Sequence, residues 1–394
     1  MGAITWGCRL LSGLLAMTLL RPSSGQAQSF GEIDAAVRSG IESGLYPGAV
    51  VVIGRRDSVL YARGYGHFTW NPASALPDVD STLWDIASIS KVVGTTSAAM
   101  RLVDRGRLDL DAPVRHYLPR FSGGPKNLVT VRMLLDHTSG LKSYVPLYLK
   151  AHKRRARAID LLYAQPLLRP PGESAEYSDL NALLLGLIVE KVGKAPLDRF
   201  VAREVFTPLG LRQTMYRPPA RLRRRIVPSG MWRGQPVPGE VNDQNAVAFG
   251  GVAGHAGVFS TGMDLARFAQ AWLREGVGPD GRWVKAATMR RFLTRGTNSG
   301  SRLLGWDSPE LSLDEPSVFG TLISQAAYGH TGFTGTELWI DPVRDLFLVF
   351  LTNRTFDPKA HDSMHGLKTV RASLSDAAIR LVPHSCTQEL IARC

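Results

Sequence analysis

The sequence predicts an α+β fold in which strands from both ends of the chain form one sheet, with a helical region inserted between them. Two observations predict it. β-rich segments lie before residue 65 and after residue 324, whereas residues 88 to about 275 are mostly helical in pattern. The chain has 394 residues, 44% of them hydrophobic and 21% charged, which are globular proportions and exclude a disordered chain, a coiled coil and a collagen.

The elements of the first part of the chain follow from local periodicity. Residues 33–43 have the spacing of a short helix, and residues 49–54 and 58–64 are β-rich segments that a short polar turn joins into a hairpin. Residues 180–192 form a strongly apolar helix that ends at a glycine, and residues 264–273 form an amphipathic helix.

The last part of the chain restores the strand pattern. We expect strands at residues 325–329, 335–340 and 346–352, followed by an amphipathic helix at residues 367–381. The terminal helices would cover one face of the sheet.

The first thirty residues have the pattern of an export signal. Arg9 precedes an apolar stretch at residues 10–20, Pro22 breaks it, and Gly25-Gln26-Ala27 offers small residues for cleavage. The stretch is too short to span a bilayer, and an uncleaved interfacial anchor is the alternative. We expect a periplasmic or secreted protein whose net charge of +13 faces membrane surfaces or anionic wall polymers, not nucleic acid.

Cysteine is sparse in the chain. Cys386 and Cys394 are the only two after Ala27, and in an oxidising compartment they could pair or remain free thiols on a tail. No cluster of cysteine and histidine has the spacing of a metal site, and we expect neither a metal nor a cofactor.

The first candidate for chemistry is Ser88 with Lys91. At a helix start, a spacing of three places both side chains on one face. A serine hydroxyl is a weak nucleophile until a neighbour takes its proton, which a partly desolvated lysine can do. The helix start also directs a backbone N–H at an oxyanion on the substrate. The alternative is an N-cap serine beside a surface lysine.

Two later segments carry further candidates. Tyr177 precedes the apolar helix and could relay a proton, whereas Asp179 could face a substrate or simply cap that helix. In His330-Thr331-Gly332, small residues would let a substrate lie along a strand edge, unless the segment is only a glycine-rich bend.

Taken in this order, Ser-x-x-Lys, Tyr-Ser-Asp and His-Thr-Gly resemble the motifs of the serine β-lactamase and penicillin-binding-protein superfamily, closest to its class C-like branch. Residues 134–141 look like the family's Leu-Leu-x-His-Thr-Ser-Gly-Leu, and residues 250–261 resemble its glycine-rich segment before a helix. The resemblance covers residues 30 to 382. It implies an antiparallel β-sheet flanked by N- and C-terminal helices, with an inserted all-helical region.

The export pattern and this resemblance together divide the chain into three parts. We expect a signal peptide at residues 1–27, a serine hydrolase domain at residues 28–385 and a C-terminal tail at residues 386–394. Within the domain, the sheet would come from residues 30–87 and 300–382, and the helical region from residues 88–299.

The resemblance also implies catalytic roles. Ser88 would be the acylated nucleophile, Lys91 would assist its deprotonation, and Tyr177 would pass a proton to the leaving group. The backbone N–H groups of Ser88 and Phe333 would form the oxyanion hole. Lysine and tyrosine are named as a pair, because which of them is the base differs between accounts of such enzymes.

Four residues would bind substrate: Asp179, His330, Thr331 and Gly332. Asp179 stands where the family usually has asparagine, and an ionised acid would repel an anionic substrate unless Lys91 pairs with it. His330 stands where the family often has lysine, and a neutral imidazole is a weaker anchor for a carboxylate. Both changes favour a peptidase or an esterase over an efficient β-lactamase.

Other polar residues have plainer interpretations. His255, between glycines, could line the cleft or be a hydrogen-bonded structural histidine, and Asp243 and Asn245 could brace a loop. We expect His137 to cap or pack.

The sequence therefore predicts an exported serine hydrolase that acts through an acyl-enzyme on an amide or ester, in the manner of a D-Ala-D-Ala carboxypeptidase or an esterase. The alternative is a sensor that binds β-lactams or wall polymer with little turnover. The expected partner is a small-molecule or peptide substrate such as a cell-wall peptide, with no nucleic acid and no integral membrane span after signal removal. The oligomeric state is not predicted.

Overall fold

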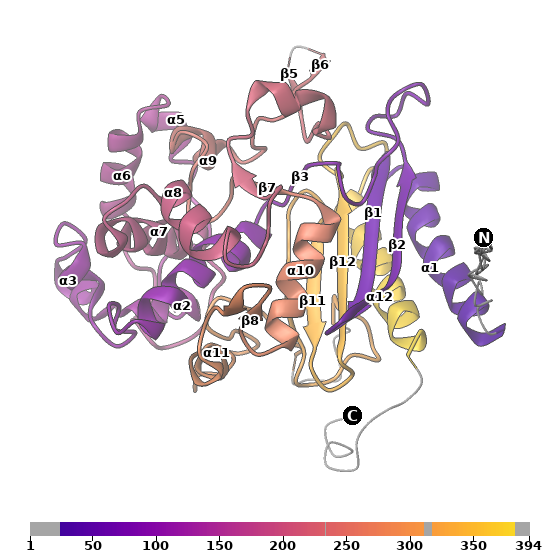
Figure 1. Cartoon of the computed structure of the whole chain (residues 1–394). Coiled ribbons are helices and arrows are strands. Elements are labelled where there is room, and N and C mark those ends of the chain that lie inside the picture. The colour runs from indigo at the N-terminus through magenta and orange to yellow at the C-terminus, as the bar shows by residue number, and fades with distance from the viewer. Residues whose placement is uncertain (1–23, 233, 311–316, 383–394) are drawn as a thin grey trace, which may run out of the picture.

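A five-stranded antiparallel sheet runs through the computed structural model, which describes residues 24–232, 234–310 and 317–382 (Figure 1). Its strand order is β10-β11-β12-β1-β2. The five strands are β1 (Gly48–Arg55), β2 (Ser58–Gly66), β10 (Tyr328–Thr331), β11 (Glu337–Asp341) and β12 (Leu346–Thr352). Because β1 pairs with β12, the two ends of the chain meet in the sheet centre, which confirms the predicted α+β fold.

The central strands are apolar on both faces, and alternate residues enter different cores. In β1, Val50 and Val52 pack into one core while Val51 and Ile53 pack into the other. Helix α10 (Gly262–Leu273) covers the first face, and α1 (Ser24–Glu42) and α12 (Ser363–Arg380) lie together on the second (Figure 1). The expectation that both terminal helices cover one face is thus confirmed.

Helices fill the middle of the chain and form the body beside the sheet (Figure 1). They are α2 (Ser97–Asp104), α3 (Val114–Tyr117), α4 (Val131–Leu135), α5 (Tyr148–Ala151), α6 (Arg155–Tyr163), α7 (Asp179–Gly193), α8 (Leu197–Val201), α9 (Gln244–Ala248) and α11 (Ala286–Phe292). Shorter or wider turns are η1 (Lys91–Thr96), η2 (Gly124–Leu128), η3 (Ala202–Phe206) and η4 (Ala220–Arg225). Helix α7 is buried along most of its length, as its strongly apolar sequence predicts.

Short strands join the sheet to the helices. The order β3-β7-β4 forms a second sheet from β3 (Trp84–Asp85), β7 (Val258–Ser260) and β4 (Met215–Tyr216). Two hairpins are formed by β5 (Met231–Trp232) with β6 (Gln235–Pro236) and by β8 (Val277–Gly278) with β9 (Gly281–Arg282). Strands of two or three residues are too short for a period-two pattern, so the sequence did not predict them.

Some predicted boundaries differ from the structure. The strand expected at residues 325–329 begins at Tyr328, because the preceding residues form a turn that Asp341 holds through the N–H and hydroxyl of Ser324 at 3.0 and 2.7 Å. The last helix begins at Ser363, four residues before the predicted start.

Two predictions concern residues at the ends of the chain. The expected signal peptide lies outside the described residues apart from residues 24–27, which begin α1, and the tail with Cys386 and Cys394 lies outside them too. In the described part of the chain, no helix combines the length and the hydropathy needed to cross a membrane.

Candidate active site

Ser88 lies between the end of β3 and the helical turn that leads into η1. The carboxylate of Asp85 accepts hydrogen bonds from the N–H of Ala87 at 2.9 Å and of Asn242 at 2.8 Å. Ala87 has a positive φ of 47°, a conformation that is strained for a residue with a side chain. The Asp85 carboxylate therefore helps to hold a tight bend that presents Ser88 at the start of a helix.

The glycine-rich segment packs along this helix. Gly254 accepts a hydrogen bond from the hydroxyl of Thr95 at 2.8 Å, and Val258 donates its N–H to Ser90 at 3.1 Å. A Cβ at Gly254 would lie 1.9 Å from the carbonyl oxygen of Ala182 in α7. Only glycine lets this segment pass between α7 and the helix that begins beside Ser88.

Lys91 connects the serine to three other groups. Its Nζ donates to Ser88 Oγ at 2.8 Å and to the carbonyl oxygen of His255 at 3.1 Å, and it lies 2.8 Å from Asp179 Oδ1. The Lys91 side chain is 4% exposed. Burial lowers its pKa, but the neighbouring Asp179 carboxylate and Tyr177 hydroxyl outweigh burial and raise the pKa overall. Lys91 is therefore an ammonium at rest.

Tyr177 lies over the same group of atoms. Its ring centroid is 5.0 Å from Lys91 Nζ and 5.8 Å from the His330 ring. Burial raises the pKa of the phenol, and nearby Lys91 and Ser88 oppose this only in part. The structure thus brings the hydroxyl, the ammonium and the phenol into one place from two distant segments.

His137 forms hydrogen bonds to both sequence neighbours of Tyr177. Its carbonyl oxygen accepts from the N–H of Glu176 at 2.9 Å, and its Nδ1 accepts from the N–H of Ser178 at 3.1 Å. The ring also packs against the Tyr177 ring at 4.9 Å. Burial lowers the pKa of His137 well below its ordinary value, so the imidazole is neutral and Nδ1 is free to accept. The sequence expectation was capping or packing, and the structure shows the packing, together with a hydrogen bond to Ser178.

Two substitutions of His137 test whether it positions Tyr177. His137→Leu removes the acceptor for Ser178, so we expect kcat to fall about 10-fold or more as Tyr177 loses its position. His137→Asn keeps a side-chain acceptor and tolerates the positive φ of 62° at this position, so it should lose less. Steady-state kinetics of both variants check this, and equal losses in the two would contradict it.

Strand β10 and the turn after it line another side of the cleft that contains Ser88 and Tyr177. His330 is buried, and burial with the charge of Lys91 lowers its pKa to about 3, so its imidazole is neutral. Its Nδ1 lies 2.7 Å from the carbonyl oxygen of Thr331, and its Nε2 has no hydrogen-bond partner among the residues that the structure describes. At Gly332, a Cβ would lie 2.8 Å from the carbonyl oxygen of Ile86, so this turn closely approaches the segment that precedes Ser88.

Two backbone N–H groups at the site are unused. Within the residues that the structure describes, neither Ser88 nor Phe333 donates its N–H to another group, whereas Ile89, Ser90 and Gly332 all do. Both residues line the same cleft. Unused donors at a substrate cleft are the arrangement that an oxyanion hole requires.

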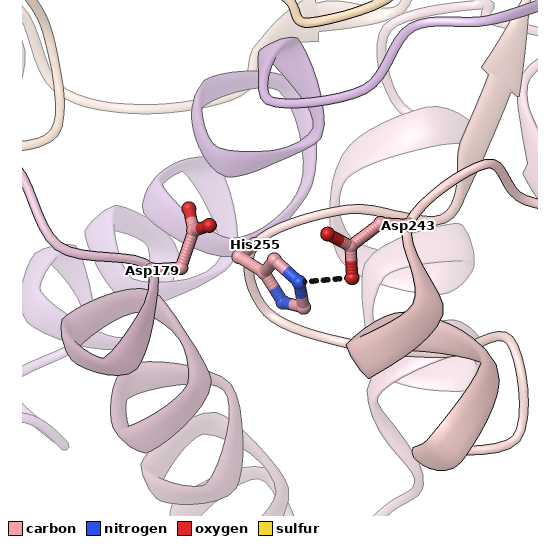
Figure 2. A group of neighbouring side chains, drawn as sticks. All are labelled: Asp179, Asp243 and His255. Carbon is pink, nitrogen blue, oxygen red and sulfur yellow. Dashed lines mark hydrogen bonds and ion pairs between the residues drawn. The ribbon is translucent and has the colours of Figure 1, made fainter. Parts of the chain in front are cut away.

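Asp179, His255 and Asp243 form a polar group on the helical side of the cleft (Figure 2). The His255 ring turns to Asp243, and its Nε2 lies 2.7 Å from Asp243 Oδ1. This contact outweighs burial and lowers the pKa of Asp243 to about 2. Asp243 also caps α9, as expected of a loop brace, through the N–H of Ala246 at 2.7 Å.

The donor atoms of these three residues lie within 4.8 Å of one another, close enough to hold a metal ion. Both carboxylates of this group nevertheless have other partners already, since Asp179 pairs with the Lys91 ammonium and Asp243 contacts His255. A metal ion there would lie beside a cation. The geometry therefore fits a network that fixes Lys91 better than it fits a metal centre.

The alternative role of Asp179 as a helix cap is wrong. Ser178 occupies the N-cap position of α7, and Asp179 is the first residue of the helix. Its carboxylate, 17% exposed, instead pairs with Lys91. His255 lines the cleft and has one bonded ring nitrogen, whereas its buried Nδ1 has no partner in the described part of the chain.

The cleft encloses about 660 Å³ and contains a cation that the sequence did not single out. Arg302 lies 5.1 Å from the Tyr177 ring and forms an ion pair with Asp307 at 3.2 Å. It belongs to no recognisable motif, so only the folded structure reveals that it faces the site.

The sequence model of the family described as Beta-lactamase matches residues 33–371. The chain belongs to the β-lactamase family. It is accordingly a serine hydrolase that acts on amide or ester bonds, and the predicted family resemblance is confirmed.

Two bacterial relatives of this β-lactamase family member have informative names. An Escherichia coli K12 protein named "Putative D-alanyl-D-alanine carboxypeptidase" is 31% identical over 348 residues, covering 80% of each chain. A Bacillus subtilis protein named N-acetylmuramyl-L-alanine amidase is 32% identical over 360 residues, covering 83% of this chain and 81% of the other.

Solved structures share the fold. EstCE1, described as a hydrolase with promiscuous acyltransferase activity, superposes with a TM-score of 0.72 at 22% identity, covering 91% of this chain and all of its own. A class C β-lactamase gives 0.70 at 19% identity with the same coverage. These neighbours support the predicted antiparallel sheet with flanking helices and an inserted helical region.

Proposed function

We propose that the protein is exported and cleaves an amide bond near the carboxyl end of a cell-wall peptide, through an acyl-enzyme on Ser88. The observation that carries this is the 2.8 Å contact between Lys91 Nζ and Ser88 Oγ, beside Tyr177 and two unused N–H groups in one cleft. Nucleophile, proton-transfer groups and oxyanion donors are what acyl transfer needs.

The reaction follows from these positions. Ser88 Oγ attacks the carbonyl carbon, and its proton passes to the Lys91–Tyr177 pair after that pair has lost one proton to solvent. The N–H groups of Ser88 and Phe333 receive the oxyanion. Tyr177 then delivers a proton to the leaving nitrogen, the C–N bond breaks, and water hydrolyses the acyl ester with the same pair as base.

The cations of the cleft favour a carboxylate on the leaving group. The neutral His330 offers no charge to a carboxylate, whereas Arg302 beside Tyr177 does. A leaving group that ends in a carboxylate is a C-terminal amino acid. This favours a carboxypeptidase over a muramyl amidase or an esterase, and it agrees with the name of the E. coli relative.

A panel of substrates tests the function. We expect the mature protein to release D-alanine from a D-Ala-D-Ala peptide with a higher kcat/KM than it shows for p-nitrophenyl acetate or a chromogenic cephalosporin. Faster ester cleavage would indicate an esterase. Covalent labelling by penicillin with no turnover of any substrate would support the sensor alternative instead.

Arg302 gives a prediction specific to the carboxylate. Arg302→Gln should raise KM for the D-Ala-D-Ala peptide about 10-fold or more, because a charge-assisted hydrogen bond to the carboxylate is lost. Its kcat/KM for p-nitrophenyl acetate, which has no carboxylate, should change little. Equal losses on both substrates would show that Arg302 acts on Tyr177 or on folding and does not bind the leaving group.

Export is a separate part of the proposal, and the pattern of residues 1–27 supports it. Expression of the full chain in a bacterium, followed by intact mass measurement, should give a protein in the extracytoplasmic fraction that begins at Gln28. A full-length chain in the cytoplasmic fraction would contradict export.

A further inference from the structure

Two buried arginines hold the turn that carries Phe333. Arg354, just after β12, donates its Nε to the carbonyl oxygen of Phe333 at 3.0 Å. Arg371, on α12, donates Nη2 to the carbonyl oxygens of Gly332 at 3.0 Å and Thr336 at 2.8 Å. The two arginines are 6% and 3% exposed. Three carbonyls of one five-residue turn are therefore fixed by guanidinium groups from outside it.

Neither arginine has an ion-pair partner among the residues that the structure describes, although both are buried. The Nη2 of Arg354 also donates to the carbonyl oxygen of Phe333, and its Nη1 donates to the neutral hydroxyl of Ser363 at 2.9 Å. Burying an unpaired cation is unfavourable, so a structural role alone would be better served by a pair with a carboxylate. Here the guanidinium donors are directed at the turn instead.

The nearest candidate for a counter-ion is neutral at pH 7. Glu337, the first residue of β11, is fully buried, and within residues 24–232, 234–310 and 317–382 neither of its side-chain oxygens has a hydrogen-bond partner. Burial raises its pKa to about 8, and Arg371 opposes this only in part. Tyr46, the other titratable group beside Arg371, is also neutral, because burial raises its pKa far above the ordinary value. Positive charge behind the turn is thus not cancelled.

We propose that Arg354 and Arg371 are positioning residues of the oxyanion site, which hold the Phe333 N–H toward Ser88 and place positive charge behind a tetrahedral oxyanion. The proposal rests on the proposed function, since it requires such an adduct on Ser88. It assigns a catalytic consequence to two residues of the C-terminal region that no motif contains.

Reversible binding of phenylboronic acid isolates this step. The serine oxygen adds to trigonal boron, the serine proton is released, and a tetrahedral boronate anion forms whose oxygen occupies the oxyanion site. We expect Arg354→Met and Arg371→Met each to weaken boronate binding about 10- to 100-fold. This loss is no larger than the loss caused by removing an oxyanion-hole donor. Arg371→Lys, which keeps the charge, should recover part of the affinity.

The matched control is Arg344→Met. Arg344 is also largely buried, but it pairs with Asp341 at 3.2 Å at the other end of β11. Its substitution should leave boronate binding within two-fold of the original protein. Methionine variants of Arg354 and Arg371 that melt at the original temperature and still bind boronate within two-fold would overturn the proposal.

A pH series keeps the proposal testable if the methionine variants fail to fold. Above pH 8, Glu337 becomes ionised and should offset the charge of Arg371, whereas Arg354 stays cationic and Tyr46 stays neutral. The boronate affinity of the original protein should then fall relative to that of Glu337→Gln. An affinity ratio between the two proteins that does not change from pH 6.5 to 9 would overturn the electrostatic part. If the original protein binds boronate no better than Ser88→Ala, the proposed function itself fails.

Discussion

Replacing Lys91 with methionine will lower the rate of acylation about 10³-fold, because the Ser88 hydroxyl then lacks the group within 2.8 Å that exchanges its proton. Pre-steady-state labelling with a fluorescent penicillin measures this rate directly. The substitution also leaves the Asp179 carboxylate without its partner, which should cost about 3 kcal/mol of unfolding free energy.

A double variant separates the two effects. Lys91→Met with Asp179→Asn removes both charges together, so stability should return toward that of the original protein while acylation stays slow. If the double variant also regained acylation, Lys91 would have only a structural role.

Asp179→Asn alone has a predictable effect on pH dependence. Asp179 raises the pKa of Lys91, so the Lys91–Tyr177 pair is fully protonated at rest and kcat/KM should rise with pH as the pair loses a proton. Without that carboxylate, the pKa of Lys91 falls, and the acid limb of the profile should shift to lower pH. An unshifted limb would contradict the assignment of this limb to Lys91.

Tyr177→Phe will reduce kcat by about 10²- to 10⁴-fold, because the phenol that we propose as proton donor to the leaving nitrogen is lost while the ring remains. The ring contacts with His137 and His330 are retained, so the melting temperature should change little.

The leaving group provides the control for Tyr177. A p-nitrophenyl ester leaves as a stable anion and needs less protonation, so acylation by this ester should be less impaired than acylation by the D-Ala-D-Ala peptide. An equal loss on both substrates would show that Tyr177 acts before the leaving group departs.

The sequence predicted the parts of the fold that local pattern controls. The limits of β12 agree residue for residue, because six consecutive apolar residues followed by Thr352 form a strand buried on both faces. The strand before His330 was misplaced, since the turn that delays it depends on Asp341, a residue distant in sequence. The short strands around Ser88 were missed because they are defined by pairing partners and not by pattern.

The residues of the candidate site also fall into two groups, those that the sequence reveals and those that it does not. Ser88, Lys91 and Tyr177 lie in motifs and could be singled out from the sequence. In the structure Ser88 and Tyr177 line one cleft, and the buried Lys91 contacts Ser88 at 2.8 Å. Arg302, Arg354 and Arg371 could not, because arginine at an isolated position is most often a surface residue. Their importance depends on burial and on which carbonyls or rings they face, and only the folded chain provides this information.

The most direct test of the account is to locate the covalent adduct. The mature protein is incubated with a fluorescent penicillin or an organophosphonate, digested, and the labelled peptide is sequenced by mass spectrometry, with Ser88→Ala as the control. The account predicts one adduct, on Ser88, and none in the variant. Labelling that persists in Ser88→Ala, or that falls on another residue, would contradict it.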